Sequence, residues 1–284
     1  MNSVKISVII CTYNRKSVLE RVLTAYKKQT FRDFEIILAS DGASDGTDEM
    51  VSELGPSLGY RLTYIRQEDN GFRKSLAVNK AVRESTGQIL IFADDDMIPP
   101  PHFLESYEKI YRSASDPDRV LVYSKYIPIV PDDKLFTMEN IVNGEFMNRY
   151  TLHWRMHFLY WKIKYLLYFQ KKHPLRPKLN GGNFSVSAAA FRAINGLDSD
   201  FVGWGYEDDD LRRRLLVYGV TQKEAVCSAW LFNLGYVPES KTTFGSSENR
   251  AAENKKLAYD KTRPARCVRG MMEAEAAEIP FRNF

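Results

Sequence analysis

Two acidic clusters, separated by about a hundred residues, are the part of this sequence best suited to chemistry. The first is Asp94-Asp95-Asp96, directly after the apolar run at 89–93, and the second is Glu207-Asp208 within an aromatic, glycine-containing stretch. Carboxylates at a strand end suit a divalent cation and the diphosphate it carries, because hard cations prefer oxygen ligands and often also hold substrate phosphate. A carboxylate on a separate turn can deprotonate an attacking hydroxyl. Together the clusters predict group transfer from an activated donor.

Alternating strand and helix patterns through the first 125 residues predict the elements that position these side chains. We expect strands over 4–11, 34–39, 62–66 and 89–93, helices over 17–29, 47–54 and 74–84, and a further helix beginning at Pro99-Pro100-Pro101. This alternation favours an α/β fold with a mainly parallel central sheet flanked by helices. Ligands of such sheets bind beyond the carboxyl ends of the strands. Thr12, Asp41 and the first acidic cluster all follow predicted strand ends.

The composition is that of a globular enzyme. The chain has 284 residues, 44% of them hydrophobic, and its net charge of +4 is too small to indicate a nucleic-acid partner. Its three cysteines are widely spaced and odd in number, which is typical of reduced thiols in an intracellular protein. Because the N-terminus lacks the pattern of a signal peptide, we expect a cytoplasmic location.

Residues 146–197 contain no aspartate or glutamate, although basic and aromatic residues are interleaved there. Charged residues and histidines interrupt the segment too often for a transmembrane span. Two interpretations remain open for the part at 150–172. It is either an interfacial segment that contacts the inner face of the cell membrane, with aromatics at headgroup depth and cations near anionic lipid, or a helix that packs its aromatics on the core.

Several motifs in order along the chain resemble family 2 glycosyltransferases of the GT-A fold. They are Val8-Ile9-Ile10-Cys11-Thr12-Tyr13-Asn14-Arg15, Ser40-Asp41-Gly42 with Thr47, and Phe92-Ala93-Asp94-Asp95-Asp96. The second half, with Asn180-Gly181-Gly182-Asn183-Phe184-Ser185-Val186 and Gly203-Trp204-Gly205-Tyr206-Glu207-Asp208-Asp209-Asp210-Leu211, is similar to chondroitin-polymerase-type transferases and β-1,4-galactosyltransferases.

The resemblance implies a nucleotide-sugar donor and assigns a set of residues to it. The donor-binding residues are expected to be Thr12, Tyr13, Arg15, Asp41, Lys74, Asp94, Asp95, Asp96, Gly181 and Gly182. Asp41 would contact the uracil of a UDP-sugar, although an aspartate before glycine also bonds its own turn. Asp96 is the expected ligand of Mn²⁺ or Mg²⁺. Asp95 is expected to point to the other side of an extended chain and to be structural.

The resemblance also assigns the acceptor side. Asp208 would be the general base, and Glu207 would hold acceptor hydroxyls. The alternative is that both acids only favour a helix N-terminus. Trp204 and Gly205 would contact the acceptor sugar, although a core position for Trp204 remains open, and Gly181 and Gly182 would allow close backbone approach or merely form a turn.

One departure concerns the metal. The resembling families place a histidine after the acidic turn, and the matching position here is Asn233. An amide oxygen is a weaker ligand than imidazole for a transition metal, so the departure puts metal affinity in doubt.

These observations predict an inverting, metal-assisted glycosyltransferase that moves a sugar from a UDP-sugar to a saccharide or lipid-linked saccharide acceptor in surface polysaccharide biosynthesis. We expect a nucleotide-sugar-binding half at 1–130, an acceptor-binding and catalytic half at 131–250 that includes the basic aromatic segment 146–178, and a tail or lid at 251–284. The alternatives are a catalytically weakened saccharide-binding relative and a nucleotidyltransferase, although the latter should show a glycine-rich phosphate loop after the first strand.

Overall fold

A central eight-stranded sheet organises the chain. The computed structural model describes residues 6–130, 133–173, 175–235, 248–274 and 282–283. From edge to edge the strands are β11 (Arg282–Asn283), β3 (Arg61–Arg66), β2 (Phe34–Ser40), β1 (Ile6–Thr12), β4 (Ile89–Asp94), β8 (Asn183–Ser187), β6 (Val120–Tyr123) and β9 (Thr221–Glu224). Strands β3, β2, β1 and β4 are parallel to one another, whereas β8 is antiparallel to both of its neighbours. The predicted α/β fold with a mainly parallel sheet is confirmed.

The register of the first strands brings their carboxyl ends to one edge. Thr12 lies opposite Ser40, and Cys11 lies opposite Asp94. These strands form because their apolar, β-branched residues are buried on both faces, as expected for a parallel sheet covered by helices. Asp41 and the first acidic cluster therefore follow neighbouring strand ends, as the sequence predicts. Of the predicted first strand, residues 4 and 5 lie outside the described residues.

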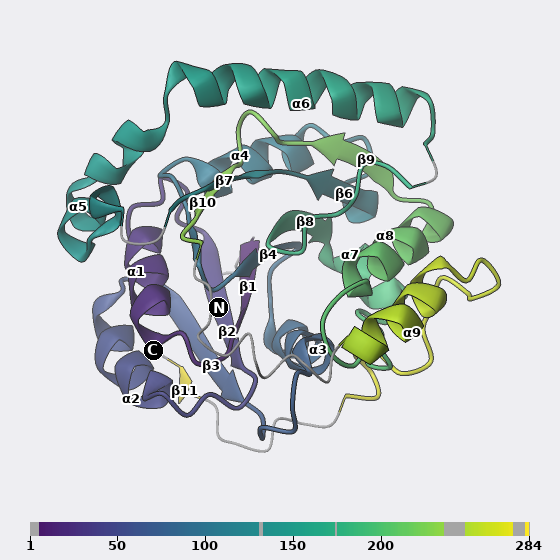
Figure 1. Ribbon diagram of the computed structural model, residues 1–284, viewed down its shortest axis with the longest axis horizontal. Coiled ribbons are helices and arrows are strands. Elements are labelled where there is room, and N and C mark those ends of the chain that lie inside the picture. The colour runs from purple at the N-terminus through teal and green to yellow at the C-terminus, as the bar shows by residue number, and fades with distance from the viewer. Residues whose placement is uncertain (1–5, 131–132, 174, 236–247, 275–281, 284) are drawn as a thin grey trace.

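Helices cover both faces of the sheet. They are α1 (Lys16–Tyr26), α2 (Thr47–Leu54), α3 (Lys74–Glu84), α4 (Phe103–Arg112), α7 (Ala188–Ala193) and α8 (Glu207–Tyr218). Figure 1 shows α1 and α2 on one side of the first strands and α3 on the other. The helix expected at the three prolines begins only at Phe103, because the prolines occupy the approach to the helix and His102 is its N-cap residue.

A small second sheet lies beside the acidic cluster that follows β4. Its strands are β5 (Met97–Ile98), β10 (Leu231–Asn233) and β7 (Tyr126–Pro128), in that order. Asn233 pairs with Met97, and the backbone N–H of Leu234 donates to the carbonyl oxygen of Asp96 at 3.0 Å. The position that the resemblance assigned to a metal ligand therefore lies beside the first acidic cluster.

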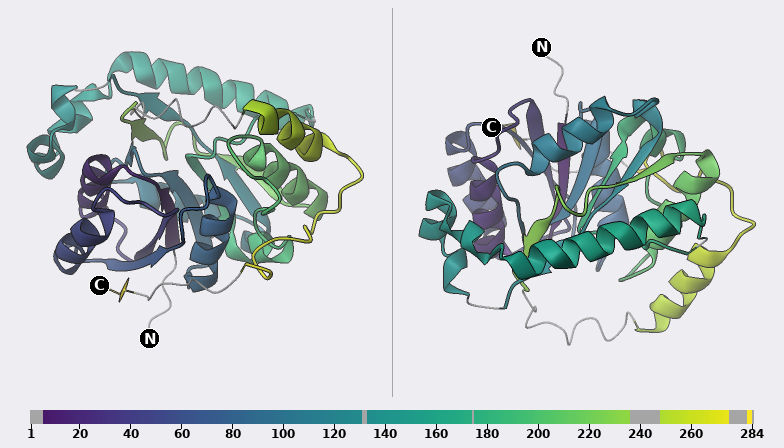
Figure 2. Two further views of the ribbon diagram at one scale, coloured as in Figure 1. Left: turned by 60° about the horizontal axis from the view of Figure 1, so that its bottom comes forward. Right: turned by 90° about the horizontal axis from the view of Figure 1, so that it is seen from above.

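The basic aromatic segment forms the long helix α6 (Leu152–Gln170), which runs along the outside of the molecule after α5 (Met138–Asn143) (Figures 1 and 2). Its Phe158 and Tyr165 are buried and contact Trp230 and Tyr123. Most of the aromatics of this helix therefore pack on the core, whereas Tyr160 is exposed, and contact of the segment with a membrane stays a prediction. Within the described ranges, no helix combines the length and apolar character that crossing a membrane requires.

The last described helix, α9 (Glu248–Tyr259), lies beside α8 (Figure 1). After it, residues 260–274 pack against the loop that follows α7. Ser199 N–H donates to the carbonyl oxygen of Arg269 at 2.7 Å, and Met271 N–H donates to that of Asn195 at 2.8 Å. These residues of the predicted tail or lid are thus bonded to the second half of the chain, whereas its last described residues form β11 and pair with β3 of the first half. The rest of that tail, apart from β11, lies outside the described residues.

Candidate active site

One end of the site is formed where β2 ends. Asp41 is buried, and its carboxylate accepts hydrogen bonds from Gln67 Nε2 at 2.5 Å and from the backbone N–H of Arg73 at 2.8 Å. Burial raises the pKa of Asp41, although these two hydrogen bonds oppose the shift. Nearby, the Tyr13 hydroxyl donates to Asp69 at 2.9 Å. Asp41 is therefore bonded to the segment after β3 and not only to its own turn.

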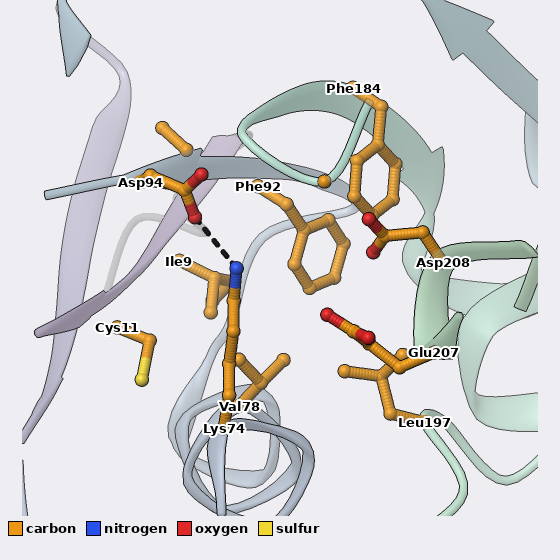
Figure 3. A pocket seen from close by; sticks show the side chains of 12 residues that line it. Ile9, Cys11, Lys74, Val78, Phe92, Asp94, Phe184, Leu197, Glu207 and Asp208 are labelled. Carbon is orange, nitrogen blue, oxygen red and sulfur yellow. Dashed lines mark hydrogen bonds and ion pairs between the residues drawn. The ribbon is translucent and has the colours of Figure 1, made fainter. Parts of the chain in front are cut away.

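The first acidic cluster is held by two cations. Lys74 Nζ lies 2.7 Å from Asp94 Oδ1, as Figure 3 shows. A single atom, Arg15 Nη1, lies 3.0 Å from Asp95 Oδ1 and 3.1 Å from Asp96 Oδ2. The expectation that Asp95 points away from Asp96 is wrong, because residues 95–96 form a turn and not an extended chain.

The surroundings of Asp96 disfavour its negative charge, as expected where a cation would bind. Burial, Asp95 and Asp94 together raise its pKa to about 7, and Arg15 only partly offsets them. A divalent cation would relieve this repulsion, and carboxylate oxygens are ligands that Mg²⁺ and Mn²⁺ accept. The donor chemistry of Asp94 and Asp96 therefore fits a hard cation that keeps further positions for diphosphate or water.

The second predicted ligand, Asn233, fits less well. Asn233 Nδ2 lies 3.3 Å from Asp96 Oδ1, while Asn233 Oδ1 accepts from the backbone N–H of Gly235 at 2.8 Å. As oriented, the amide presents its nitrogen to the acidic cluster. In the part of the chain that the structure describes, no three His, Cys, Asp or Glu side chains are grouped as a complete metal site.

The second acidic cluster begins helix α8. Gly203, Gly205 and Tyr206 before it have positive φ values of 79°, 102° and 72°, and this turn places Glu207 and Asp208 in the first helical turn. Both side chains line the same pocket as Asp94 and Lys74 (Figure 3). The structure thus brings together two clusters that are far apart in the sequence.

Lys74 is the charge between these clusters. Its burial disfavours the ammonium form, but Asp94, Asp208 and Glu207 outweigh that effect and raise the pKa of Lys74. Burial, followed by the neighbouring Glu207, raises the pKa of Asp208 well above its ordinary value. Among the described residues Glu207 Oε2 is buried without a hydrogen-bond partner. The pocket therefore holds a carboxyl group able to exchange a proton and a carboxylate oxygen free to accept one more bond.

Gly181 and Gly182 bridge the two clusters. A Cβ atom at position 181 would collide with the Asp208 carboxylate, and one at position 182 would lie 2.5 Å from Asp94 Oδ2. Only glycine gives the backbone this close approach. These two glycines are therefore required by the close approach of the backbone to both carboxylates, and not only by a turn.

Trp204 stands on the turn before α8 with 66% of its side chain exposed. A core position for this indole is thus excluded, and its face is free to contact a sugar. The carbonyl of the next residue, Gly205, accepts from Asn254 Nδ2 at 3.2 Å, and so does the carbonyl of Val202. The C-terminal helix α9 thereby fixes this turn.

Sequence reasoning missed the residues that support the second cluster. Asp209 accepts from Lys178 Nζ at 3.2 Å and from the Tyr259 hydroxyl at 2.9 Å, and Asp210 pairs with Arg214 at 2.6 Å. Gln67, the partner of Asp41, was also missed. Its signal was available, because it directly follows the third strand at the same sheet edge, whereas nothing in the sequence links Tyr259 or Asn254 to the acidic turn.

Comparison with known proteins places this geometry in a family. The profile described as "Glycosyl transferase family 2" matches residues 7–194, and that described as "N-terminal domain of galactosyltransferase" matches residues 168–231. The chain is 30% identical to a validoxylamine A glucosyltransferase of Streptomyces hygroscopicus subsp. jinggangensis over 76% of this chain and 52% of that protein. It is 27% identical to a chondroitin synthase of Escherichia coli over 74% of this chain and 32% of that protein.

The chain therefore spans about half, or less, of the length of these curated relatives. Among solved structures it is similar to the mannosyltransferase PcManGT from Pyrobaculum calidifontis in complex with GDP-Man and Mn²⁺. The TM-score is 0.57 at 18% identity, covering 96% of this chain and 69% of that one. This likeness confirms the predicted GT-A fold, and the two profiles confirm the predicted resemblance of both halves.

Proposed function

The chain belongs to glycosyl transferase family 2, and from that premise we propose that it transfers a sugar from a nucleotide-sugar donor, UDP-linked, to a hydroxyl of a saccharide acceptor with inversion. The observation that carries the proposal is that Asp94 of the first acidic cluster lines the same pocket as Glu207 and Asp208 of the second, with Lys74 between them. One cluster is suited to the diphosphate end of a donor, and the other is suited to an acceptor hydroxyl. A site for transfer needs both.

In this mechanism Asp208 acts as the general base. Its carboxylate takes the proton from the acceptor hydroxyl while that oxygen attacks the anomeric carbon from the side opposite the diphosphate. The new glycosidic bond forms as the bond to the diphosphate oxygen breaks, so the configuration at the anomeric carbon inverts. The raised pKa of Asp208 makes it a stronger base than an ordinary aspartate.

The other residues bind and orient. We propose that Asp41 contacts the base of the nucleotide, that Glu207 holds acceptor hydroxyls through its unpartnered oxygen, and that Trp204 packs against the acceptor sugar. Asp96, with Asp94 and more weakly Asn233, would hold a divalent cation, which would neutralise charge on the departing diphosphate. The ammonium group of Lys74 is close enough to Asp94 to pair with the same phosphates.

The names of the relatives bear on the identity of the acceptor. A relative is named chondroitin synthase, so we propose a growing surface saccharide as the acceptor. A lipid-linked form would agree with membrane contact through residues 150–172, and cytoplasmic location at the inner membrane face stays a prediction. A saccharide-binding relative with weakened catalysis is the second candidate, because Asn233 presents its nitrogen to Asp96.

Mass spectrometry tests the proposal most directly. The protein would be incubated with Mn²⁺, oligosaccharides and a panel of UDP- and GDP-sugars, and both transfer and donor hydrolysis would be scored. We expect a saccharide longer by one sugar with one UDP-sugar, and far less of it with Asp208→Asn. Saccharide binding without transfer or hydrolysis for any donor would reject the enzyme and favour the second candidate.

A further inference from the structure

Helix α6 is apolar on two opposite faces. Its inner face is buried through Phe158 and Tyr165, whereas six aliphatic side chains elsewhere on the helix are between 44% and 72% exposed. These are Leu152, Met156, Leu159, Ile163, Leu166 and Leu167. An exposed run of this kind needs an explanation, because contiguous apolar patches on a protein surface usually mark an interaction site.

The spacing of these residues defines one continuous surface. Residues 152, 156, 159, 163 and 166 are separated by alternating steps of four and three, so they line one side of the helix. We call these five residues the aliphatic stripe. The buried residues 158 and 165 fall on the opposite side of the same helix, and Figure 2 shows α6 on the outside of the molecule. The stripe therefore faces away from the protein.

The charged residues of α6 beside the stripe are all positive. At a rotation of about 100° per residue, Arg155 falls along one edge of the stripe and Lys164 along the other. Lys162, next to Arg155, pairs with Glu224 of β9 at 3.6 Å and contributes less to this positive charge. No aspartate or glutamate occurs anywhere from 146 to 197. A second copy of α6 would set these cations against identical cations, which is unfavourable. An anionic surface of lipid headgroups is complementary to both the stripe and its edges.

We propose that α6 lies flat in the headgroup region of an anionic membrane, with the aliphatic stripe inserted and its flanking cations on the headgroups. This proposal specifies how residues 150–172 would contact the membrane. Only its consequence for the acceptor rests on the proposed function. Trp154 and Trp161 are partly buried against the core, so the inserted side chains are aliphatic, whereas the sequence indicated aromatics at headgroup depth.

Residues that follow α6 in the chain contact helix α8, which carries Glu207 and Asp208. Arg212 of helix α8 donates to the backbone carbonyls of Arg176 at 3.1 Å and His173 at 3.5 Å, and Lys178 pairs with Asp209. A membrane-bound α6 would thus hold the acceptor side of the pocket close to the lipid surface. A lipid-linked acceptor would be presented there without leaving the membrane.

Co-sedimentation with vesicles tests the proposal. Vesicles of equal parts phosphatidylcholine and phosphatidylglycerol should bind the protein, and phosphatidylcholine alone should bind it far less. Leu159→Gln, Ile163→Gln and Leu166→Gln together should lower partitioning by about tenfold or more, because three inserted aliphatic groups are lost. The matched control Val217→Gln, Val268→Gln and Met272→Gln, which changes exposed apolar residues elsewhere, should bind like wild type.

Salt and charge variants separate the electrostatic contribution to vesicle binding from the contribution of the inserted aliphatic side chains. Arg155→Gln with Lys164→Gln should reduce binding by roughly tenfold at low salt and much less at high salt, because screening already removes the electrostatic part. Failure of wild-type protein to sediment with the anionic vesicles, or equal binding by the triple glutamine variant, would overturn the proposal. Light scattering that shows a dimer dissociated by the triple variant, without vesicle binding, would assign the stripe to a second copy instead.

The activity assay keeps this inference distinct from the proposed function. The triple glutamine variant should transfer sugar to a soluble acceptor at the wild-type rate, because no changed residue lines the pocket. Vesicle binding with no transfer by wild type would reject the proposed function alone. Transfer without vesicle binding would reject the membrane surface alone.

Discussion

Asp208 combines two features that suit a base, namely a raised pKa and a nearby cation that favours its charged form. Burial and Glu207 raise its pKa, and Lys74 opposes them. Replacing Asp208 with asparagine keeps its shape and removes the base. We expect transfer to fall by about two to four orders of magnitude, while calorimetry should show UDP affinity near wild type.

The neighbouring acid provides the control for that variant. Asp209 pairs with Lys178 and Tyr259 and does not line the pocket. Asp209→Asn keeps an oxygen that can accept from both partners, so it should retain the support of the second cluster and most of the turnover. Near-normal turnover in Asp208→Asn would reject Asp208 as the base and point to Glu207.

The raised pKa also predicts the pH profile. A general base works in its deprotonated form, so kcat/KM should fall as the pH drops through the pKa of Asp208 in the free enzyme. Because that pKa is raised, the acidic limb should lie above the ordinary aspartate value of about 3.9. The profile should be measured at saturating Mn²⁺, so that protonation of Asp96 contributes little. A limb at the ordinary value would contradict the environment described for Asp208, and the residual activity of Asp208→Asn should lack the limb.

The metal prediction concerns Asp96 and Asn233. Asp96→Ala removes a ligand and also some like-charge repulsion, so we expect a folded protein that has lost metal-dependent UDP binding. Asn233→His should tighten Mn²⁺ binding, because imidazole is the better ligand for a transition metal. Calorimetry with UDP and Mn²⁺ measures both effects, and Asp33→Ala, which changes an exposed aspartate before the start of β2, serves as the control. Unchanged UDP affinity in Asp96→Ala would sink the assignment, and unchanged Mn²⁺ affinity in Asn233→His would remove Asn233 from the site.

At the scale of elements, α9 holds in place the turn at 202–206 that we propose contacts the acceptor, here called the acceptor turn. Asn254 is buried and donates to the carbonyls of Val202 and Gly205 on either side of Trp204. Asn254→Ala leaves two carbonyls without these bonds, which costs about 1–3 kcal/mol for a buried group. We expect the acceptor KM to rise about tenfold or more while UDP affinity is unchanged, as measured by steady-state kinetics and calorimetry.

A matched substitution checks that this effect is local. Asn140 in α5 also donates to a backbone carbonyl, that of Lys134 at 2.7 Å, but does not line the pocket. Asn140→Ala should leave both constants unchanged. Equal effects of Asn254→Ala on donor and acceptor binding would show that α9 supports the whole fold and not the acceptor turn.

The helices and strands also show which parts of the fold could be predicted from the sequence. The strands before residue 95 could be predicted because their apolar residues form short runs bounded by turns, and their parallel order followed from the helices between them. The position of β8 could not, because Asn183–Ser187 is short, polar at alternate positions and remote from both of its partners. For α6, the sequence showed an apolar helix with cations, but only the packing of Phe158 and Tyr165 shows which face remains exposed.

At the scale of the whole molecule, the two predicted halves share one sheet. Strand β8 of the second half lies between β4 and β6 of the first, and Phe184 stacks on Phe92 at 4.6 Å between ring centroids. The division at 130 therefore separates proposed binding roles but cuts through a continuous core. The site depends on this arrangement, because Gly181 and Gly182 precede β8 and reach the acidic strand end of β4.

This continuity predicts a single cooperative unfolding transition. All four tryptophans lie in residues 131–250, so their fluorescence reports on the second half, whereas far-UV circular dichroism reports on the whole chain. We expect the two probes to give coincident curves in urea. Phe184→Ala should lower the free energy of unfolding by about 3–5 kcal/mol and shift both curves together, because it leaves a cavity between the halves. The exposed substitution Val217→Ala should shift neither curve appreciably. Separate transitions, with Phe184→Ala moving only the fluorescence, would show that the halves fold as independent domains.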